Sequence, residues 1–111
     1  MTIITVNKPG IITVSMRDEL ECTVGSVQTH IDKIDNNAFV WSVWVDRHVR
    51  RQGIATKLLI ETERIVRLSG SAVISLHNGG GDRAEGLYRK LGFRYLRGDK
   101  HESMNIMIKE L

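Results

Sequence analysis

The chain has 111 residues, 41% of them hydrophobic and 26% charged, and carries a formal net charge of +3 at pH 7. This length predicts a single domain over residues 1–111, and no apolar run approaches the roughly 20 residues that cross a bilayer. The net charge is too small to indicate nucleic-acid binding by itself, so neither a membrane protein nor a nucleic-acid binder is expected.

The beginning of the chain predicts two strands. Residues 1–6 lack the basic start and the cleavage site of a signal peptide, and we interpret them as a strand. A β-branched strand over residues 11–16 follows the turn signal Pro9-Gly10.

A longer strand is predicted over residues 21–31, and Gly25 within it is typical of a β-bulge. This strand contains Cys22, the only cysteine. One cysteine forms neither an internal disulfide nor a cysteine-based zinc site, so no metal is expected and a reducing, cytoplasmic setting fits. We interpret Cys22 as a small, half-buried hydrophobic residue.

Residues 39–45 give the strongest strand signal in the chain. They follow a turn at 35–37, and their apolar residues fall on both faces of the predicted strand. A strand that is apolar on both faces is usually central and covered on both sides. Trp41 and Trp44 leave three roles open, as core residues, dimer contacts or a wall of the substrate site, and we interpret them as core residues.

The hydrophobic period then changes to that of a helix over residues 54–68, and Gly70 is a plausible stop. A short strand at 72–77 follows. Strand, helix and strand form one βαβ unit, whose crossover is right-handed in nearly all proteins and makes the two strands parallel.

The last third predicts a second helix and two more strands. After the glycine loop 79–81, Asp82 is a plausible cap for a helix over residues 82–91, which Gly92 ends. Strands at 93–96 and 104–108 close the chain.

The loop 50–55 and the start of the second helix are expected to meet at the carboxyl ends of the two parallel strands, where open α/β sheets place ligands. A helix N-terminus has free N–H groups and a partial positive charge, which suit a phosphate. Gly53 allows close approach of the backbone. Neither Gly-x-x-x-x-Gly-Lys-[Ser/Thr] nor Gly-x-Gly-x-x-Gly occurs, which argues against the common nucleotide-binding loops.

Two segments resemble motifs of the GNAT (Gcn5-related N-acetyltransferase) superfamily. Residues 45–59 resemble its motif A, Arg/Gln-x-x-Gly-x-Gly/Ala, through Arg50, Gly53 and Ala55. Residues 84–93 resemble its motif B, which ends Leu-Tyr-x-Lys-x-Gly-Phe. The resemblance covers about residues 24–97. It implies an α/β (α+β) fold with a mixed, mostly antiparallel central sheet, one parallel strand pair, helices packed on the sheet, and N-terminal helices shortened or absent.

The resemblance also implies an acetyl-CoA-dependent N-acetyltransferase, in which a primary amine of a small molecule, peptide or protein attacks the thioester directly. Tyr88 matches the tyrosine that protonates the leaving thiolate. The positions matching the acyl-CoA contacts are two strand residues for the pantetheine arm and the motif A loop for the pyrophosphate: Trp44, Val45, Arg50, Arg51, Gln52, Gly53, Ile54, Ala55 and Thr56.

The chain departs from this pattern in two places. Many members carry a catalytic glutamate on the strand before motif A, but residues 39–45 contain no acid. The nearest polar candidates for a base are Ser42, Asp46, His48 and His30, and none stands out. Only residues 7–10 separate the first two strands, where the family usually has helices that shape the acceptor site. This site is therefore expected to be open, built by a second subunit in a homodimer, or suited to a large substrate.

The main alternative is a catalytically weak or inactive GNAT-fold module that acts by binding another protein. The absent glutamate and absent helices favour it, whereas the presence of Gly53 and Tyr88 favours the enzyme.

Overall fold

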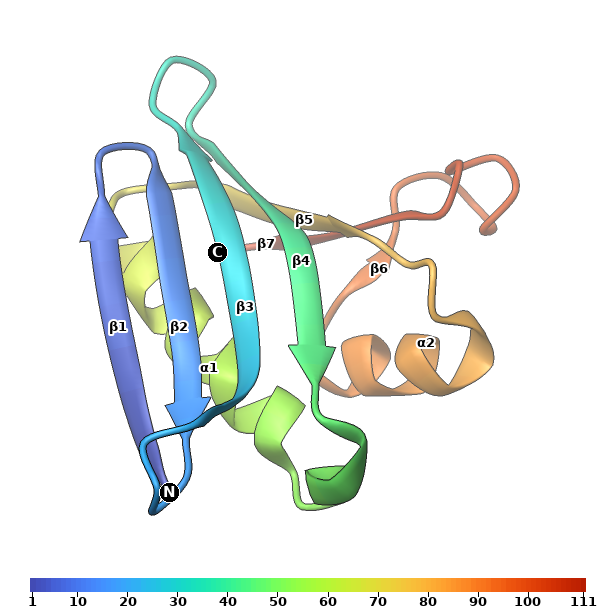
Figure 1. Cartoon of the computed structure of the whole chain (residues 1–111). Coiled ribbons are helices and arrows are strands. Elements are labelled where there is room, and N and C mark those ends of the chain that lie inside the picture. The colour runs from blue at the N-terminus through green and yellow to red at the C-terminus, as the bar shows by residue number, and fades with distance from the viewer.

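A computed structural model describes residues 1–111 as one seven-stranded sheet with two α-helices (Figure 1). The strand order is β1-β2-β3-β4-β5-β7-β6, and every neighbouring pair is antiparallel except β4 and β5. This confirms the mixed sheet with one parallel pair. The elements are β1 (Thr2–Lys8), β2 (Ile11–Arg17), β3 (Thr23–Asp32), β4 (Asn37–Val45), α1 (Ile54–Leu68), β5 (Val73–His77), α2 (Gly81–Lys90), β6 (Arg94–Tyr95) and β7 (Ile106–Glu110).

The helix predicted over 54–68 is confirmed with the same bounds, but the second helix begins one residue early, at Gly81. Its cap is Gly80, which makes no side-chain cap bond, so the prediction that Asp82 caps it is wrong. The final strand begins at Ile106 because Met104 and Asn105 adopt positive φ angles in the preceding turn. Neither helix is long and apolar enough to cross a membrane.

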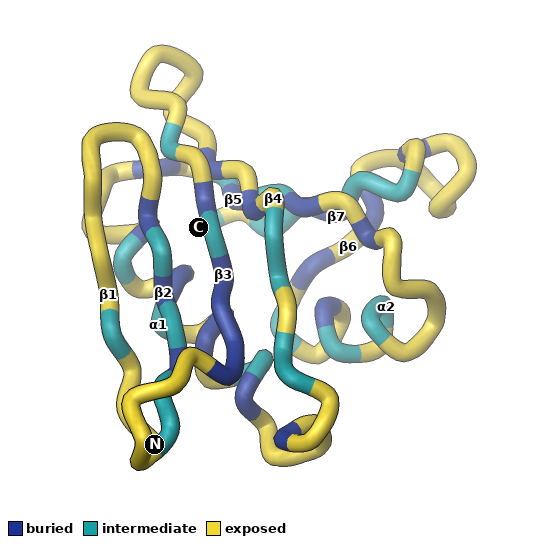
Figure 2. The backbone as a smooth tube through the Cα atoms, in the orientation of Figure 1, coloured by how far each residue is buried: buried dark blue, intermediate teal, exposed yellow.

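Helix α1 covers one face of β2, β3 and β4 (Figure 1). Its inner side buries Leu58, Leu59 and Val66 against a core that continues through Val14 and Val27. Figure 2 shows buried stretches in both α1 and β3. Burying this apolar surface is the main source of stability for the fold. Much of the core therefore lies between α1 and the sheet, and it continues to Tyr88 of α2 and Tyr95 of β6.

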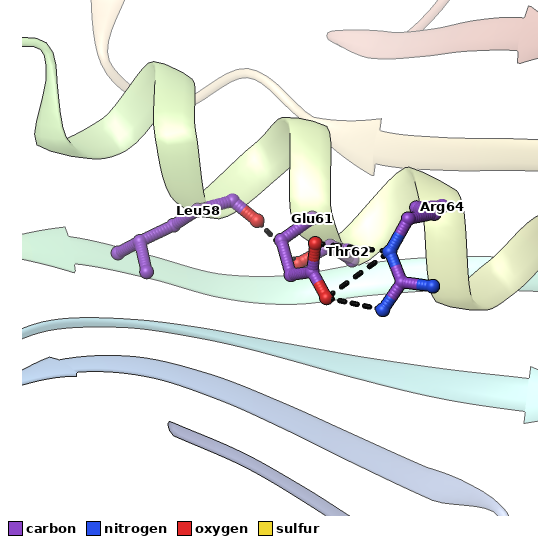
Figure 3. A network of polar contacts seen from close by, with 4 residues as sticks. All are labelled: Leu58, Glu61, Thr62 and Arg64. Carbon is purple, nitrogen blue, oxygen red and sulfur yellow. Dashed lines mark hydrogen bonds and ion pairs between the residues drawn. The ribbon is translucent and has the colours of Figure 1, made fainter. Parts of the chain in front are cut away.

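One polar residue on the buried side of α1 is satisfied within the helix. Thr62 is fully buried and donates its hydroxyl to the Leu58 carbonyl at 2.7 Å (Figure 3). On the outer side, Arg64 Nη2 lies 2.6 Å from Glu61 Oε1, and this hydrogen bond holds the pKa of Glu61 below its usual value. The pair marks the solvent side of the helix.

Two β-bulges, one in β3 and one in β4, change the direction in which the side chains of these strands point. The β2–β3 register shifts beside Gly25, which confirms the bulge predicted there. The β3–β4 register also shifts, because Gln28 pairs with Ser42 while Thr29 pairs with Val40. Trp41 is thus the extra residue of a second bulge.

The face of β1–β4 turned away from α1, here called the open face, has no helix over it. Phe39, Trp41 and Trp44 are 38%, 51% and 43% exposed, and the Trp41 ring stands edge-on to His30 with centroids 5.6 Å apart. The predictions that the β4 strand is covered on both faces and that both tryptophans are core residues are therefore wrong. Cys22 is also exposed rather than half-buried, since it belongs to a turn held by the Asp18 carboxylate.

Candidate functional site

The two parallel strands separate towards their carboxyl ends. They pair only from Asn37 with Val73 to Val40 with Leu76, while β4 continues to Val45 and β5 to His77. Beyond Val40 the two strands therefore leave a gap, and α2 follows shortly after β5.

The backbone of β4 turns the polar groups of two residues towards this gap, and of these only the Val45 carbonyl has a partner, Arg50 Nε at 3.1 Å. The Asp46 amide donates to the Val24 carbonyl at 2.8 Å, which makes Gly25 and Val45 a non-hydrogen-bonded pair of the antiparallel ladder. The alternation then turns the N–H and C=O groups of Val43 and Val45 away from β3. An extended amide-bearing ligand can pair with such an edge, as an added strand does.

The loop between β4 and α1 holds a run of amides without protein acceptors. None of the backbone N–H groups from Arg51 to Thr56 donates to another group of the chain, and the first to do so is that of Lys57, to Gly53 at 3.1 Å. Arg51 and Gly53 have φ angles of 67° and 73°. Left-handed residues within a turn direct successive amides to one side, and the helix dipole adds positive potential there.

A pocket of about 310 Å³ lies against these amides and is called the loop pocket. Arg50, Arg51 and Arg83 line it, so three guanidinium-bearing side chains border the unpartnered amides. Arg50 also donates its Nε to the Val45 carbonyl at 3.1 Å, which fixes the loop to the end of β4. Amides, helix N-terminus and arginines together suit a multiply charged phosphate ligand.

A second pocket, of about 500 Å³, lies in the gap between β4 and β5 and is called the gap pocket. Val43 and His77 line it from the strands, and Ala84 and Tyr88 line it from α2. Tyr88 is buried, and burial raises the pKa of its hydroxyl above the usual value. A phenol of this kind stays protonated at neutral pH and can supply a proton.

The turn between β5 and α2 is held by a partly buried polar network. The Tyr95 hydroxyl donates to Glu85 Oε1 at 2.6 Å and accepts from Asn78 Nδ2 at 3.1 Å. Asn78 also accepts from the Gly80 amide at 3.2 Å. The hydrogen bond to Glu85 raises the pKa of Tyr95, and the same bond lowers that of Glu85. These bonds fix the start of α2, which carries Tyr88.

The structure brings most of the predicted site residues together. Val45, Arg50, Arg51, Gly53, Ile54, Ala55 and Thr56 line the loop pocket, and Tyr88 lines the gap pocket. Gln52 and Trp44 line neither, although the Gln52 amide belongs to the unpartnered run. Of the polar candidates for a base, only Ser42 lines the gap pocket.

Sequence reasoning did not select His77 or Arg83 as site residues. His77 ends β5 and therefore faces the same gap as β4, and Arg83 lies four residues before Leu87, which also lines the loop pocket. A signal for both was present: the last residue of a parallel strand and the first turn of the next helix point to the same edge of the sheet.

Comparison with known proteins gives a family and a set of similar folds. The model of the acetyltransferase (GNAT) family matches residues 5–93. No curated protein matches the sequence significantly. Similar solved structures include the PaiA N-acetyltransferase of Thermoplasma acidophilum in complex with coenzyme A, with 21% identity and a TM-score of 0.76. The chain is 92% covered by this match but spans 62% of that enzyme.

Two further structures have comparable folds. A GNAT-family acetyltransferase of Staphylococcus aureus has 21% identity and a TM-score of 0.78, over 92% of this chain and 68% of that one. An acetyltransferase of Bacillus cereus has 22% identity and a TM-score of 0.74, over 91% of this chain and 73% of that one. At these identities the likeness concerns the fold.

Proposed function

This chain belongs to the acetyltransferase (GNAT) family, and from that premise we propose that residues 1–111 act as a single-domain N-acetyltransferase. Its acyl donor is acetyl-CoA, and its acceptor is a primary amine that attacks the thioester directly. The observation that carries this proposal is the run of unpartnered amides from Arg51 to Thr56 at the N-terminus of α1.

The residues present fit acetyl-CoA along its length. The loop pocket, with its amides and arginines, would hold the pyrophosphate. The N–H and C=O groups of Val43 and the N–H group of Val45 would pair with the amides of the pantetheine arm, because the Val45 carbonyl already accepts from Arg50. The thioester would then lie in the gap pocket beside Tyr88. Trp44 of β4 pairs with Ser26 of β3, so its backbone groups are directed towards β3. A contact between Trp44 and the pantetheine arm stays a prediction.

The roles in the reaction follow from these positions. Acetyl-CoA supplies an activated acetyl group and a thiolate leaving group. Tyr88, kept protonated by its burial, would donate a proton to the departing sulfur. An inward amide of β4, such as that of Val43, would stabilise the negative charge that develops on the carbonyl oxygen.

The test is a calorimetric titration of the purified protein with acetyl-CoA, followed by a screen of amine acceptors for thiol release. Micromolar binding and thiol release that depends on a primary amine are the expected results. Absence of binding at millimolar acetyl-CoA would contradict the proposal.

A GNAT-fold module that acts by protein contact remains the second candidate, because β4 carries no carboxylate and the open face has no helix over it. Acetyl-CoA binding without thiol release for any amine would favour this candidate over the enzyme.

A further inference from the structure

His77 lies where two pockets of the protein adjoin. It lines the gap pocket, and it also lines a pocket of about 410 Å³ formed with the β6–β7 connection, here called the β7 pocket. Apart from Tyr88, it is the only residue lining the gap pocket that has an ionisable side chain. The His77 side chain makes no hydrogen bond or ion pair within the protein and is exposed. A ring nitrogen is thus available to a ligand.

The side chain of His77 belongs to the open face of the sheet. Ser75 pairs with Phe39 in the parallel ladder, and alternate residues of a strand share a face, so His77 lies on the same side as Phe39 and Trp41. Both aromatic side chains line the gap pocket and remain partly exposed. The gap pocket therefore opens onto an apolar wall with one imidazole beside it.

The proposed reaction needs a base at this place. An alkyl ammonium with a pKa near 10.4 is neutral in only about one molecule in 10³ at pH 7. The lone pair of the amine becomes available only after one proton has been removed. The β4 residues that line the gap pocket offer no carboxylate, and neither His30 nor His48 lines it.

We propose that His77 is the general base of the acetyl transfer, and that the acceptor is a primary amine on an aromatic or other apolar body lying against Phe39 and Trp41. This inference rests on the proposed function. The ionisable groups that face His77 are Tyr88 from α2 and, across the β7 pocket, Arg97 and Glu102 from the β6–β7 connection. Glu102 attracts the incoming ammonium, and Arg97 disfavours a second positive charge on the acceptor.

The proton balance of the step is complete. The ammonium gives one proton to a ring nitrogen of His77, and its nitrogen then bonds to the carbonyl carbon of the thioester. As the C–S bond breaks, the sulfur takes the hydroxyl proton of Tyr88. Tyr88 regains a proton from the new amide nitrogen, and His77 releases its proton to water.

The test compares two amines on three proteins. Benzylamine is cationic at pH 7 and needs a base, whereas aniline is already neutral. The proteins are the wild type, His77→Gln, and His101→Gln as a control in an exposed turn that lines none of these pockets. Each is first titrated with acetyl-CoA, which reports folding and the donor site independently of the base.

We expect His77→Gln to bind acetyl-CoA normally, to lose about 10²-fold in kcat with benzylamine, and to stay within about threefold of the wild type with aniline. Its rate with benzylamine should rise about tenfold per pH unit up to the pKa of the amine, whereas the wild-type rate should level off at lower pH. The His101→Gln protein should match the wild type.

Three results would overturn the inference. An unchanged rate with benzylamine in His77→Gln would exclude His77 as the general base. An equal loss of rate with both amines would show that the role of His77 is structural. A wild type that binds acetyl-CoA but acetylates no benzylamine contradicts the acceptor class. Failure of the wild type to bind acetyl-CoA contradicts the proposed function itself, and so is distinguished from these.

Discussion

Gly53 is the residue on which the shape of the amide run depends. Its φ angle of 73° is one that most side chains avoid, and no atom lies within 4 Å of the position that a Cβ would take. A substitution there therefore changes backbone strain and the chemistry of the loop pocket more than it changes packing.

We predict that Gly53→Glu abolishes acetyl-CoA binding, because a carboxylate would project beside the amides that would otherwise receive the pyrophosphate. Calorimetric titration measures the effect. Gly53→Asn is the matched control, since asparagine tolerates the left-handed region and carries no charge, and it should retain binding within about tenfold. A folded Gly53→Glu protein with unchanged affinity would remove the loop from the donor site.

Tyr88 is expected to act on turnover and not on donor binding. We predict that Tyr88→Phe lowers kcat about 10²-fold while the affinity for acetyl-CoA changes little. Because burial raises the pKa of Tyr88, the wild-type rate should not fall on the alkaline side before the pH passes the ordinary tyrosine pKa of about 10. Equal turnover of Tyr88→Phe and wild type, measured by thiol release, would exclude Tyr88 as the acid.

At the level of the elements, the first turn of α1 packs directly over Gly25 of β3. A Cβ at this position would lie 3.2 Å from a methyl group of Ile54 and 3.2 Å from the Trp44 carbonyl oxygen. The glycine thus lets the first turn of α1, which carries the loop pocket, rest on β3.

We predict that Gly25→Val destabilises the protein by about 2 kcal/mol, because the added methyl groups have no room between β3 and α1. Urea unfolding gives the free energy. Gly86→Ala is a useful contrast, since no atom lies near its Cβ position and helix α2 gains propensity, so it should stabilise by about 0.5–1 kcal/mol. Equal stabilities of the Gly25→Val variant and the wild type would contradict the close packing.

Lys109 on β7 joins both helices to the sheet. Its Nζ lies 2.6 Å from the Glu63 carboxylate of α1 and donates to the Leu91 carbonyl, just after α2, at 2.7 Å. All the partners are half-buried, so these two contacts contribute more to the stability of the fold than a surface ion pair does.

We predict that Lys109→Met lowers the free energy of unfolding by about 1–2 kcal/mol, because methionine keeps the apolar stem but not the donor. Arg94→Met, which removes a more exposed pair with Glu110 on the same sheet, should change it by less than about 0.5 kcal/mol. The proposed role for Lys109 fails if thermal or urea unfolding finds the two variants equal.

In the molecule as a whole, α1 covers the sheet on one side of β1–β4, and the other side is uncovered (Figure 1). Both tryptophans of the chain, Trp41 and Trp44, lie on the uncovered side. Their fluorescence therefore reports this face alone.

We predict that both tryptophans emit at long wavelength and are quenched efficiently by acrylamide at low protein concentration. A second copy docked on the open face would shift the emission to shorter wavelength and protect it as concentration rises. Blue-shifted, protected emission at the lowest concentration would contradict an open face in the isolated chain. The measurement also distinguishes the open interpretation of the acceptor side from the homodimeric one.

The element order, the parallel pair and the loop that precedes α1 could be predicted from the sequence, because hydrophobic period and glycine positions are local signals. The 3.6-residue period over 54–68 and the motif around Gly53 needed no tertiary information. The site residues of this motif could also be predicted without tertiary information, because consecutive backbone amides at one helix end necessarily lie together.

The covered faces of the sheet and the contacts between distant residues could not be predicted in this way, because they depend on the three-dimensional fold. An apolar run such as 39–45 predicts a strand that is buried on both faces. Whether a helix covers the second face depends on elements elsewhere in the chain. The bulge at Trp41 arises from the pairing of β4 with β3, and His77 joins Tyr88 because two strands separate. Strand register, burial and shared pockets are set by contacts between segments far apart in the sequence. The hydrophobic periodicity within one segment does not predict these contacts.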